Sequence, residues 1–300
     1  MFPIIPAASA GGTGNEGCFG FGHDNTSATA VTNLVSNAGV VASDTAGVGT
    51  ARYDLAACEF GGDKGIFSGG QPGTGYVGLT NLVSDTGVVA SDTAAVTGVA
   101  LRDGLAACSY GADKGIFGFG HLMSTTNLIS NTGVVGTDVT GVGFLREKLA
   151  ATEYGGDKGI FGFGTNAGVL RSMTNLVSNL GVVATDVTGV GTIRGAPAAC
   201  NYGGDKDKGI FGFGYNATGK QSMTNLVSNA GVVASDVTGV GTAREGPGAT
   251  QYGDDKGIFG FGNDGSYTDA TNLVSNVGVV ASDVTGVGTA HGNTAACSFA

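Results

Sequence analysis

The chain has 300 residues, 41% of them hydrophobic, which is enough for one large globular domain or two ordinary ones and excludes a disordered protein. Its 58 glycines are about three times the usual share, and because they follow no three-residue period, collagen is excluded. The net charge is −10 with only 14 basic residues, so we expect no nucleic-acid partner. No apolar run approaches the roughly 20 residues of a membrane span, so we expect none.

The first segment, residues 1–10, lies outside the repeats described below and is expected to be a tail, separate from the domain formed by residues 11–300. It carries Phe2, Ile4 and Ile5 among prolines, and the repeats offer no place to bury these side chains. We expect the tail to pack on a neighbouring subunit or another protein, with folding back over its own domain as the alternative. Deleting residues 1–6 should then leave the domain folded but weaken assembly.

The rest of the chain consists of six repeats. The string Thr-Asn-Leu-(Val/Ile)-Ser begins at positions 32, 80, 126, 174, 224 and 271, at intervals of 46 to 50 residues. In chain order, a repeat contains Lys-Gly-Ile-Phe-Gly-Phe-Gly, a variable loop, Thr-Asn-Leu-Val-Ser, Gly-Val-Val-Ala-Ser-Asp, a basic residue, and a segment close to Ala-Ala-Cys-x-Tyr. Self-similarity at such a period is the signature of a repeat architecture.

Four segments of each repeat are predicted to be β-strands, because they are short, rich in Val, Ile, Phe or small residues, and separated by Gly, Asn, Asp and Ser. None has the 3.6-residue period of a helix. Four antiparallel strands per repeat, six times over, predict an all-β fold, a six-bladed β-propeller. The small-residue strand should lie innermost, where blades converge, and the outermost strands should include residues 40–43 and 232–235.

One repeat also carries a resemblance to a known family. Read from Lys208, the chain runs KGIFGFG, a variable loop, TNLVSNAG and VVASDVTGVGTAR, followed by a small-residue strand and a Gly-Asp-Lys turn. This order resembles the kelch repeat over nearly the whole chain, and the resemblance implies a β-propeller. The chain departs from the kelch pattern in that the glycine doublet appears as Phe-Gly and there is no Trp. Arrays of GIFGFG and TNLVSN also resemble virion proteins of bacteriophages.

The two ends of the chain compete for one place in this fold. Residues 6–12 and 294–300 both resemble an innermost strand, but the first blade can take only one of them. Residues 294–300 keep the Ala-Ala-Cys pattern and the aromatic residue, so we expect residues 294–299 to pair with residues 17–22. N- and C-terminal strands in one blade would close the ring and remove the exposed edges of an open one.

Two polar residues recur in the repeats and could form sites. An Asp recurs at positions 44, 92, 138, 186, 236 and 283, and an Arg at 52, 102, 146, 194 and 244, with His291 in the sixth place. The acids could bind calcium or form an Asp-box, and the arginines could clamp a carboxylate. We favour the structural alternative, in which each Asp bonds turn amides and each Arg pairs with an Asp or backbone carbonyls between blades.

The histidines and cysteines give little sign of chemistry. The three histidines, His23, His121 and His291, lie in non-adjacent blades and show no metal-ligand spacing, so we expect no metal site and no cofactor. Four of the five cysteines share one position of the innermost strand, where Thr152 and Thr250 replace them, which predicts small, half-buried, reduced thiols and assembly in a cytosol. No Ser-His-Asp order, phosphate loop or carboxylate pair outside the repeat is present, so no catalytic residues are predicted.

The variable segments are the candidate binding sites. The loop after GIFGFG and the residues after the Arg differ between repeats, and an antiparallel four-stranded blade places both on one face. Loops on a rigid scaffold are where recognition usually resides, with drift in unconstrained loops as the alternative. The candidate binding residues are His23, Asp24, Asn25, Tyr76, His121, Asn166, Arg171, Tyr215, Asn216, Lys220, Asn263, Asp264 and Tyr267.

These features favour a non-enzymatic structural or binding module. The resemblance implies a virion component, such as a bacteriophage tail, fibre or decoration subunit, assembled in the host cytoplasm and contacting other structural proteins, copies of itself or a host receptor. The alternative is a lectin-like propeller, extracellular or on a cell surface, whose loop tyrosines stack on a host-surface glycan. A third reading is an enzyme on a kelch-like frame.

Overall fold

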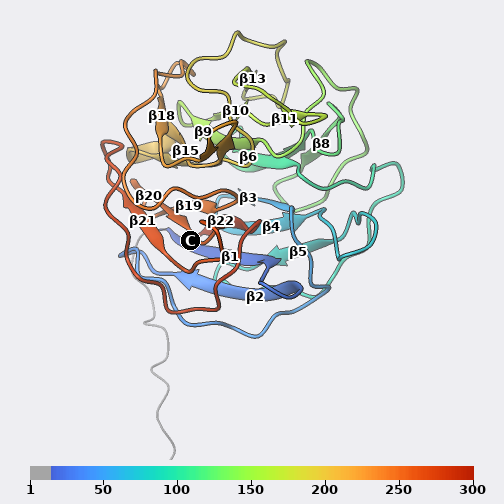
Figure 1. The fold of residues 1–300 in the computed structure, drawn as a ribbon. Helices are drawn as coiled ribbons and strands as arrows, with labels where there is room; N and C mark the ends of the chain where they lie inside the picture. Colours follow the sequence, from blue (N-terminus) through green and yellow to red (C-terminus); the bar gives the residue numbers. More distant parts are fainter. Residues whose placement is uncertain (1–14) are drawn as a thin grey trace, which may run out of the picture.

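The computed structural model describes residues 15–300, whose regular structure is almost entirely β-strand (Figure 1). The runs of Ile, Phe, Val and small residues form strands because each side chain can pack on a pleated, buried surface. One 3-10 turn, η1 (Gly204–Lys206), interrupts them. In this part of the chain no helix is long and apolar enough to cross a membrane. The predicted all-β class is confirmed.

Six three-stranded antiparallel sheets contain most of the strands. In the order inner, middle and outer strand, they are sheet 1, β22 (Ala295–Phe299), β1 (Glu16–His23) and β2 (Ala28–Val35); sheet 2, β3 (Ala56–Phe60), β4 (Lys64–Ser68) and β5 (Thr80–Val83); sheet 3, β6 (Ala106–Tyr110), β7 (Lys114–Gly118) and β8 (Thr126–Ile129); sheet 4, β9 (Ala150–Tyr154), β10 (Lys158–Gly162) and β13 (Thr174–Val177); sheet 5, β14 (Ala198–Tyr202), β15 (Lys208–Gly212) and β18 (Thr224–Val227); and sheet 6, β19 (Gly248–Tyr252), β20 (Lys256–Gly260) and β21 (Thr271–Val274). Two short hairpins, β11 (Thr165–Asn166) with β12 (Val169–Leu170) and β16 (Tyr215–Asn216) with β17 (Gly219–Lys220), extend two of the variable loops.

Both ends of the described chain meet in sheet 1. Strand β22 pairs antiparallel with β1, with Glu16 opposite Phe299 and Cys18 opposite Cys297. Figure 1 shows the red C-terminal strand beside the blue β1. The predicted pairing of residues 294–299 with residues 17–22 is confirmed. The predicted tail, with Phe2, Ile4 and Ile5, lies outside the described residues.

The inner strands contact one another in a cyclic order, β22, β3, β6, β9, β14, β19 and again β22. Six clusters of buried apolar side chains each join two consecutive sheets. In one of them, Ile116 of sheet 3 lies with Phe161 and Val177 of sheet 4. The hydrophobic core therefore lies between the sheets, and the small-residue strands are innermost, as predicted.

Glycine in the middle strands allows this close packing. A Cβ added to Gly159 would lie 2.5 Å from Sγ of Cys108 in the preceding sheet, and one added to Gly162 would lie 2.8 Å from the ring of Phe211 in the following sheet. Both contacts are too short for real carbon atoms. The glycines of the Lys-Gly-Ile-Phe-Gly segment are therefore needed so that neighbouring sheets can approach.

Two sets of backbone hydrogen bonds also run from repeat to repeat. In the first, amides donate to the carbonyl of the equivalent residue one repeat earlier: Gly104 to Asp54, Lys148 to Gly104, Ala196 to Lys148, Gly246 to Ala196, Asn293 to Gly246 and Asp54 to Asn293. In the second, turn residues bond between consecutive repeats: Gly61 to Asp113, Gly111 to Asp157, Gly155 to Asp207, Gly203 to Asp255, Gly253 to Asn15 and Ala300 to Asp63. Each set passes through all six repeats and returns to its start.

The prediction of a fourth strand in each repeat is wrong. In the first repeat, residues 40–43 make only an isolated bridge, Val35 with Val41, and the next bridge is Thr32 with Thr45. A buried side chain interrupts the ladder between these bridges, because Nδ2 of Asn33 donates to the carbonyl of Ala42 at 3.2 Å and to Asp44 at 2.9 Å. Residues 232–235 behave in the same way around Asn225. The outer edge of each sheet is therefore a segment held both by a side-chain amide and by a few backbone hydrogen bonds, such as that from the Ala42 amide to the Leu34 carbonyl at 2.8 Å.

Candidate functional site

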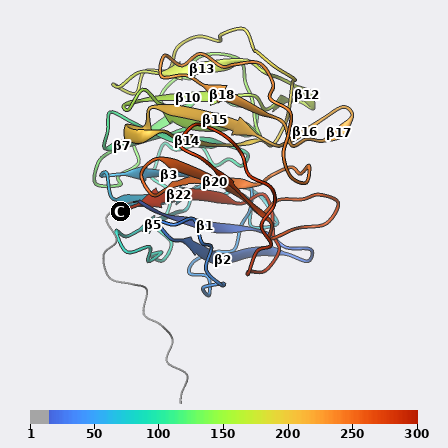
Figure 2. The ribbon, with the colours of Figure 1, turned by 90° about the vertical axis from the view of Figure 1, so that its left-hand side faces the viewer.

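Two faces of the molecule differ in how much the repeats vary. On one, the residue after the Arg position bridges to the residue after a GIFGFG segment, in the pairs Tyr53–Gln71, Glu147–Thr165, Gly195–Tyr215, Glu245–Asn263 and Gly292–His23; we call this the loop face. On the other, the turns before the middle strands and after the outer strands meet, as where Asn131 donates to Asp113 at 3.1 Å; we call this the turn face. Figure 2 shows β16 and β17 projecting on the side opposite the C-terminus. The prediction that variable segments share one face is confirmed.

The centre of the loop face is acidic. Asp54, Asp103, Glu147 and Glu245 lie in or next to the first set of backbone hydrogen bonds, and Lys148 lies among them. Desolvation raises the pKa of Asp54 to about 6, although Lys148 opposes the shift. Desolvation would lower the pKa of Lys148, but nearby charges, first Asp54, raise it above its ordinary value. Lys148 therefore stays charged and carboxylates remain in excess.

Aromatic rings surround these carboxylates. The ring of His23 lies 5.1 Å from that of Tyr53 and 5.6 Å from that of Tyr267. The ring of Tyr76 lies 4.1 Å from that of His121, tilted by 46°. Tyr and His rings can stack on a partner and also form hydrogen bonds, and the carboxylates beside them can accept hydrogen bonds. This combination gives the loop face a chemistry suited to recognition.

The candidate residues of the variable loops form groups rather than one continuous site. His23 and Tyr267 come together, with Asn25 accepting a hydrogen bond from the Tyr267 amide at 3.5 Å. Lys220 donates to Asn263 and lies 3.8 Å from Glu245. The others are used within or near their own loops: Asp24, Asn216 and Asp264 accept loop amides, Asn166 donates to the carbonyl of Leu145, Arg171 lies over Phe144, and Tyr215 covers Gly195.

The candidate list omitted residues at the centre of this face. Tyr53, Asp54, Asp103, Glu147 and Glu245 follow the Arg position and lie nearest the inner strands. A signal for them existed, because the dipeptide after the Arg varies between repeats as much as the loops do. Their convergence depends on the cyclic order of the repeats, which places residues about 50 positions apart side by side.

The recurring Arg is a structural residue. The guanidinium of Arg52 is fully buried, lies 4.2 Å from the ring centre of Phe21, and donates to Gly69 O at 2.8 Å and Asn81 Oδ1 at 2.6 Å. Its Nη1 lies 3.7 Å from Asp92. Desolvation lowers the pKa of Arg52 to about 10, so it remains charged at neutral pH. The predicted pairing between repeats is confirmed.

The recurring Asp also bonds between repeats. Asp92 accepts hydrogen bonds from the amide and hydroxyl of Thr50, one repeat earlier, at 2.9 and 2.7 Å, and from Asn81 at 2.9 Å. Desolvation acts to raise the pKa of Asp92, but these hydrogen bonds outweigh it and lower the pKa. The prediction of bonds to amides is correct, although the amide belongs to the neighbouring repeat and not to the turn of the Asp itself.

The sixth place of this network holds a histidine instead of an arginine. His291 stacks on Phe261 at 4.0 Å, and its Nδ1 lies 2.7 Å from Thr289 O. Its Nε2 and the Oδ1 of Asn33 are both buried, and neither has a hydrogen-bond partner among the described residues. Desolvation lowers the pKa of His291. A shorter side chain than Arg therefore leaves two polar atoms unsatisfied where sheets 6 and 1 meet.

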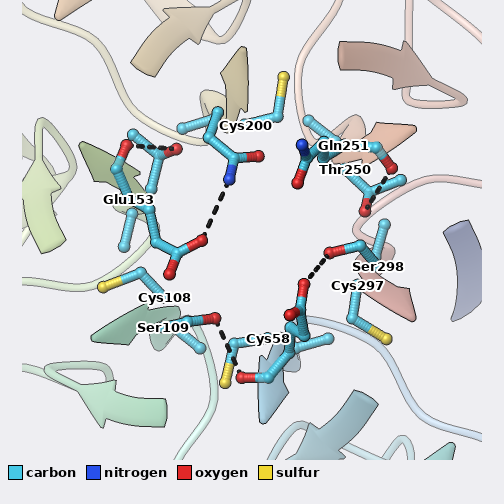
Figure 3. A pocket seen from close by; sticks show the side chains of 18 residues that line it. Cys58, Cys108, Ser109, Glu153, Cys200, Thr250, Gln251, Cys297 and Ser298 are labelled. Carbon is cyan, nitrogen blue, oxygen red and sulfur yellow. Dashed lines mark hydrogen bonds between the residues drawn. The ribbon is translucent and has the colours of Figure 1, made fainter. Parts of the chain in front are cut away.

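Near the turn face, the inner strands enclose a second polar cluster. Glu59, Ser109, Glu153, Asn201, Gln251 and Ser298 occupy one position of the six inner strands and line a small pocket of about 60 Å³ (Figure 3). Lys206, from a turn two residues longer than the others, lies 2.7 Å from Glu59 and 3.4 Å from Glu153. Desolvation raises the pKa of Glu153 to about 7, with Lys206 opposing it. The structure thus brings together a carboxylate pair that the sequence did not predict.

The cysteines point away from this pocket, as Figure 3 shows for Cys58, Cys108, Cys200 and Cys297. All five thiols are unpaired, and they are fully buried, whereas the exchange with threonine had predicted half-buried side chains. Burial raises the pKa of the Cys18 and Cys200 thiols to about 12, so the reactive thiolate is not formed near neutral pH.

The sequence was also compared with known proteins. Neither a scan against protein-family models nor a search of curated proteins finds a match to this chain.

Proposed function

We propose that the chain is a six-bladed, kelch-like β-propeller that works as a non-enzymatic binding module, and that it is a virion component such as a bacteriophage tail, fibre or decoration subunit. The cyclic contacts of the inner strands and the six apolar clusters between sheets support the propeller. The two returning sets of backbone hydrogen bonds and the pairing of β1 with β22 support its closure.

The observation that carries the binding role is the distribution of chemistry over the molecule. The polar residues that repeat, above all the Arg–Asn–Asp networks, are buried or bonded within the framework. The residues that differ between repeats gather on the loop face, on segments bridged to one another. Variable segments on a rigid framework are suited to recognition. The excess of carboxylates and the aromatic rings of this face favour a partner that presents basic or hydroxyl groups.

A second surface supports assembly into a larger structure. The first valine of Gly-Val-Val is between 63% and 66% exposed in every repeat, at positions 40, 88, 134, 182, 232 and 279. Exposed apolar side chains that gather into a patch mark contact surfaces. We propose that this edge contacts other structural proteins or further copies of the chain. The buried thiols are compatible with assembly in a reducing host cytoplasm.

The first experiment tests the virion context. Mass spectrometry of purified particles encoded by the same genome should detect this chain in stoichiometric amount, and its gene should lie among tail or capsid genes. Absence from particles, or a gene among metabolic enzymes, would overturn the virion proposal.

The second experiment tests the loop face. The structural protein encoded next to this chain is immobilised, and binding of the wild type is compared with that of Tyr53→Ala/Tyr267→Ala on the loop face and Lys64→Ala/Lys256→Ala on the turn face. Only the loop-face variant should lose binding, by at least about tenfold for two central aromatic residues. Equal losses in both variants would contradict the assignment of the face.

The aromatic rings also favour a second candidate, a lectin-like propeller. Tyr53, Tyr76 and Tyr267 are partly exposed beside carboxylates, an arrangement that suits sugar rings and hydroxyls. A glycan array with the same variants separates the candidates. Glycan binding that Tyr53→Ala/Tyr267→Ala abolishes would support the lectin, and a blank array would leave the protein contact as the proposal.

A further inference from the structure

One group of metal-ligating side chains lies on the loop face. Asp103, His121 and Glu147 each offer a ligand atom, and these three atoms lie within 4.8 Å of one another. Nδ1 of His121 is 3.8 Å from Oδ1 of Asp103. All three side chains are partly buried, so they are accessible to an ion yet held by their surroundings. The sequence around His121 shows no metal-ligand spacing, because the carboxylates beside it, Asp103 and Glu147, come from distant positions of the chain.

The framework fixes the backbone of each ligand. Asp103 and Glu147 follow buried arginines in consecutive repeats, and His121 follows strand β7 after a single Phe-Gly pair. The amide of His121 donates to the carbonyl of Asp103 at 3.0 Å, and the amide of Glu147 donates to the carbonyl of Thr165 at 2.9 Å. The ring of Tyr76 packs against His121. Ligands held by such contacts lose little freedom when an ion binds.

The charge around the group also favours a cation. Over residues 15–300, neither Asp103 nor Glu147 forms an ion pair with a Lys or Arg side chain within 4.0 Å. The ammonium group of Lys148 acts on Asp103 and Glu147, but it interacts most strongly with Asp54. Glu245 adds another carboxylate to the same surface. Two carboxylates beside an imidazole thus have only the shared positive charge of Lys148 to compensate them.

We propose that Asp103, His121 and Glu147 bind a first-row divalent transition-metal ion such as Zn²⁺ or Co²⁺. One imidazole nitrogen with two carboxylate oxygens suits these ions, whereas Mg²⁺ and Ca²⁺ prefer oxygen alone. In a tetrahedral site, ligand atoms bound at about 2.1 Å lie about 3.4 Å apart, so the widest pair must close by up to about 1.4 Å. The three rotatable bonds of Glu147 can supply that movement. Three protein ligands leave positions for water or for a donor group of a partner.

Among the six equivalent places of the loop face in the described chain, this set of three ligands occurs once. Equivalent positions around His121 hold Gly292, His23 and Tyr53 in the first repeat, Tyr53, Gln71 and Asp103 in the second, Glu147, Thr165 and Gly195 in the fourth, Gly195, Tyr215 and Glu245 in the fifth, and Glu245, Asn263 and Gly292 in the sixth. None of these described sets has three metal-ligating side chains. His23 is therefore a matched control, since it occupies the position of His121 without flanking carboxylates.

The test is a titration of the full chain, freed of metal by chelator and dialysis, with Co²⁺ followed by visible absorption and with Zn²⁺ followed by calorimetry. The wild type should bind one equivalent of each ion. His121→Gln and Asp103→Asn should each weaken binding at least about tenfold, while His23→Gln should leave it unchanged. Melting of each metal-free variant shows whether it is folded, and Glu147→Gln replaces any that is not.

Three results would overturn the proposal: no stoichiometric binding by the wild type, unchanged binding by His121→Gln, or an equal loss in His23→Gln. Ion binding is measured on the isolated protein without any partner. Its failure would therefore leave the proposed role of the loop face intact, and failure of partner binding would leave the metal site intact.

Discussion

At the scale of single residues, the recurring Arg decides whether consecutive repeats fit together. A buried guanidinium is costly unless its charge is paired and its donors are bonded. Arg52 meets both conditions, with Asp92 at 3.7 Å, a carbonyl and an amide oxygen as acceptors, and the face of Phe21 beneath it. Asp92 also accepts a hydrogen bond from the amide of Thr50. Arg52 and its partner Asp92 thus link sheet 1 to sheet 2 and hold the segment that contains Thr50.

Arg52→Met should destabilise the fold by about 3–5 kcal/mol, because Asp92 and Asn81 would lose a partner in a buried place. Urea unfolding followed by circular dichroism measures the loss. Arg171→Met is the control, since Arg171 is only partly buried, lies over Phe144 and forms no ion pair among the described residues, so it should change stability by less than about 1 kcal/mol. Equal stabilities of Arg52→Met and the wild type would contradict the structural role of the network.

His291→Arg should stabilise the protein by about 1–3 kcal/mol, because an Arg can donate to Asn33 Oδ1, which now has no partner in the described chain. The gain should grow in acid. Desolvation holds the pKa of His291 below its ordinary 6.5, so the unfolded state takes up the proton first and wild-type stability falls as the pH drops through that value. Arg does not titrate there.

Thermal melts of His291→Arg and wild type between pH 5 and 8 measure both effects. The reverse change, Arg244→His, places the same defect between sheets 5 and 6 and should lower stability. A destabilised His291→Arg, or a gain that is the same at every pH, would contradict this account.

At the scale of elements, the sequence predicts three of the four strands of each repeat, because their composition and turn residues are strong local signals. It fails at the fourth, Gly-Val-Val-Ala-Ser-Asp, whose valines are typical of a strand. The failure has one cause: the buried side chain of Asn33 takes the place of ladder hydrogen bonds. Whether an Asn in a strand faces solvent or bonds a neighbouring segment is not encoded in strand propensity.

The candidate site was only partly predictable for a related reason. The sequence indicates which segments vary and that they share a face. It does not indicate that Asp103 and Glu147, 44 positions apart, flank His121, since that depends on the register between repeats. Likewise, Lys206 is visible only as an extra residue in a turn, and its approach to Glu59 and Glu153 follows from the shape of that turn.

Lys206 lies in the long turn that contains η1 and bonds two buried carboxylates. Lys206→Met would leave Glu59 and Glu153 facing each other without a cation, at a cost of about 3–5 kcal/mol at pH 8. The cost should shrink towards pH 5. The pKa of Glu153 is already raised to about 7 and would rise further without Lys206, so protonation relieves the repulsion in acid.

Melts of Lys206→Met at pH 5 and pH 8 test this expectation. Lys208→Met is the matched control, because Lys208 is partly exposed and its ion pair within residues 15–300 is with the partly exposed Asp207. A pH-independent loss in Lys206→Met would mean that packing, and not charge, explains the role of the residue.

At the scale of the whole molecule, stability should depend on completing the circuit of repeats. The apolar clusters, the Arg networks and the backbone bonds between sheets join consecutive repeats, and only the ion pair of Lys206 with Glu59, among the contacts described above, reaches a more distant sheet. In an open array the first and last sheets would each lack one set of these contacts. Strand β22 removes that defect by completing sheet 1.

The last prediction concerns the two chain ends. In sheet 2 the inner and middle strands are joined by Gly61, Gly62 and Asp63. Ala300 and Asn15 make the backbone hydrogen bonds of the first and third residues of such a turn, as the amide of Ala300 bonds Asp63 and the carbonyl of Asn15 accepts from Gly253. One added glycine between Ala300 and Asn15 should therefore complete a normal turn, and the chain can be opened between Gly62 and Asp63 instead.

This circular permutant, built from residues 15–300, should fold cooperatively and melt within a few degrees of the unpermuted chain of the same residues, because no contact between repeats changes. A chain that ends at Gly292 loses β22, exposes the edge of β1 and interrupts both sets of backbone bonds, so it should lose its cooperative transition. Calorimetry of the permutant, the unpermuted chain and the truncated chain measures whether each unfolds cooperatively and at what temperature. If the truncated chain melted like the full one, or the permutant failed to fold, the six repeats would not act as a closed circuit, and the propeller proposed here would be wrong.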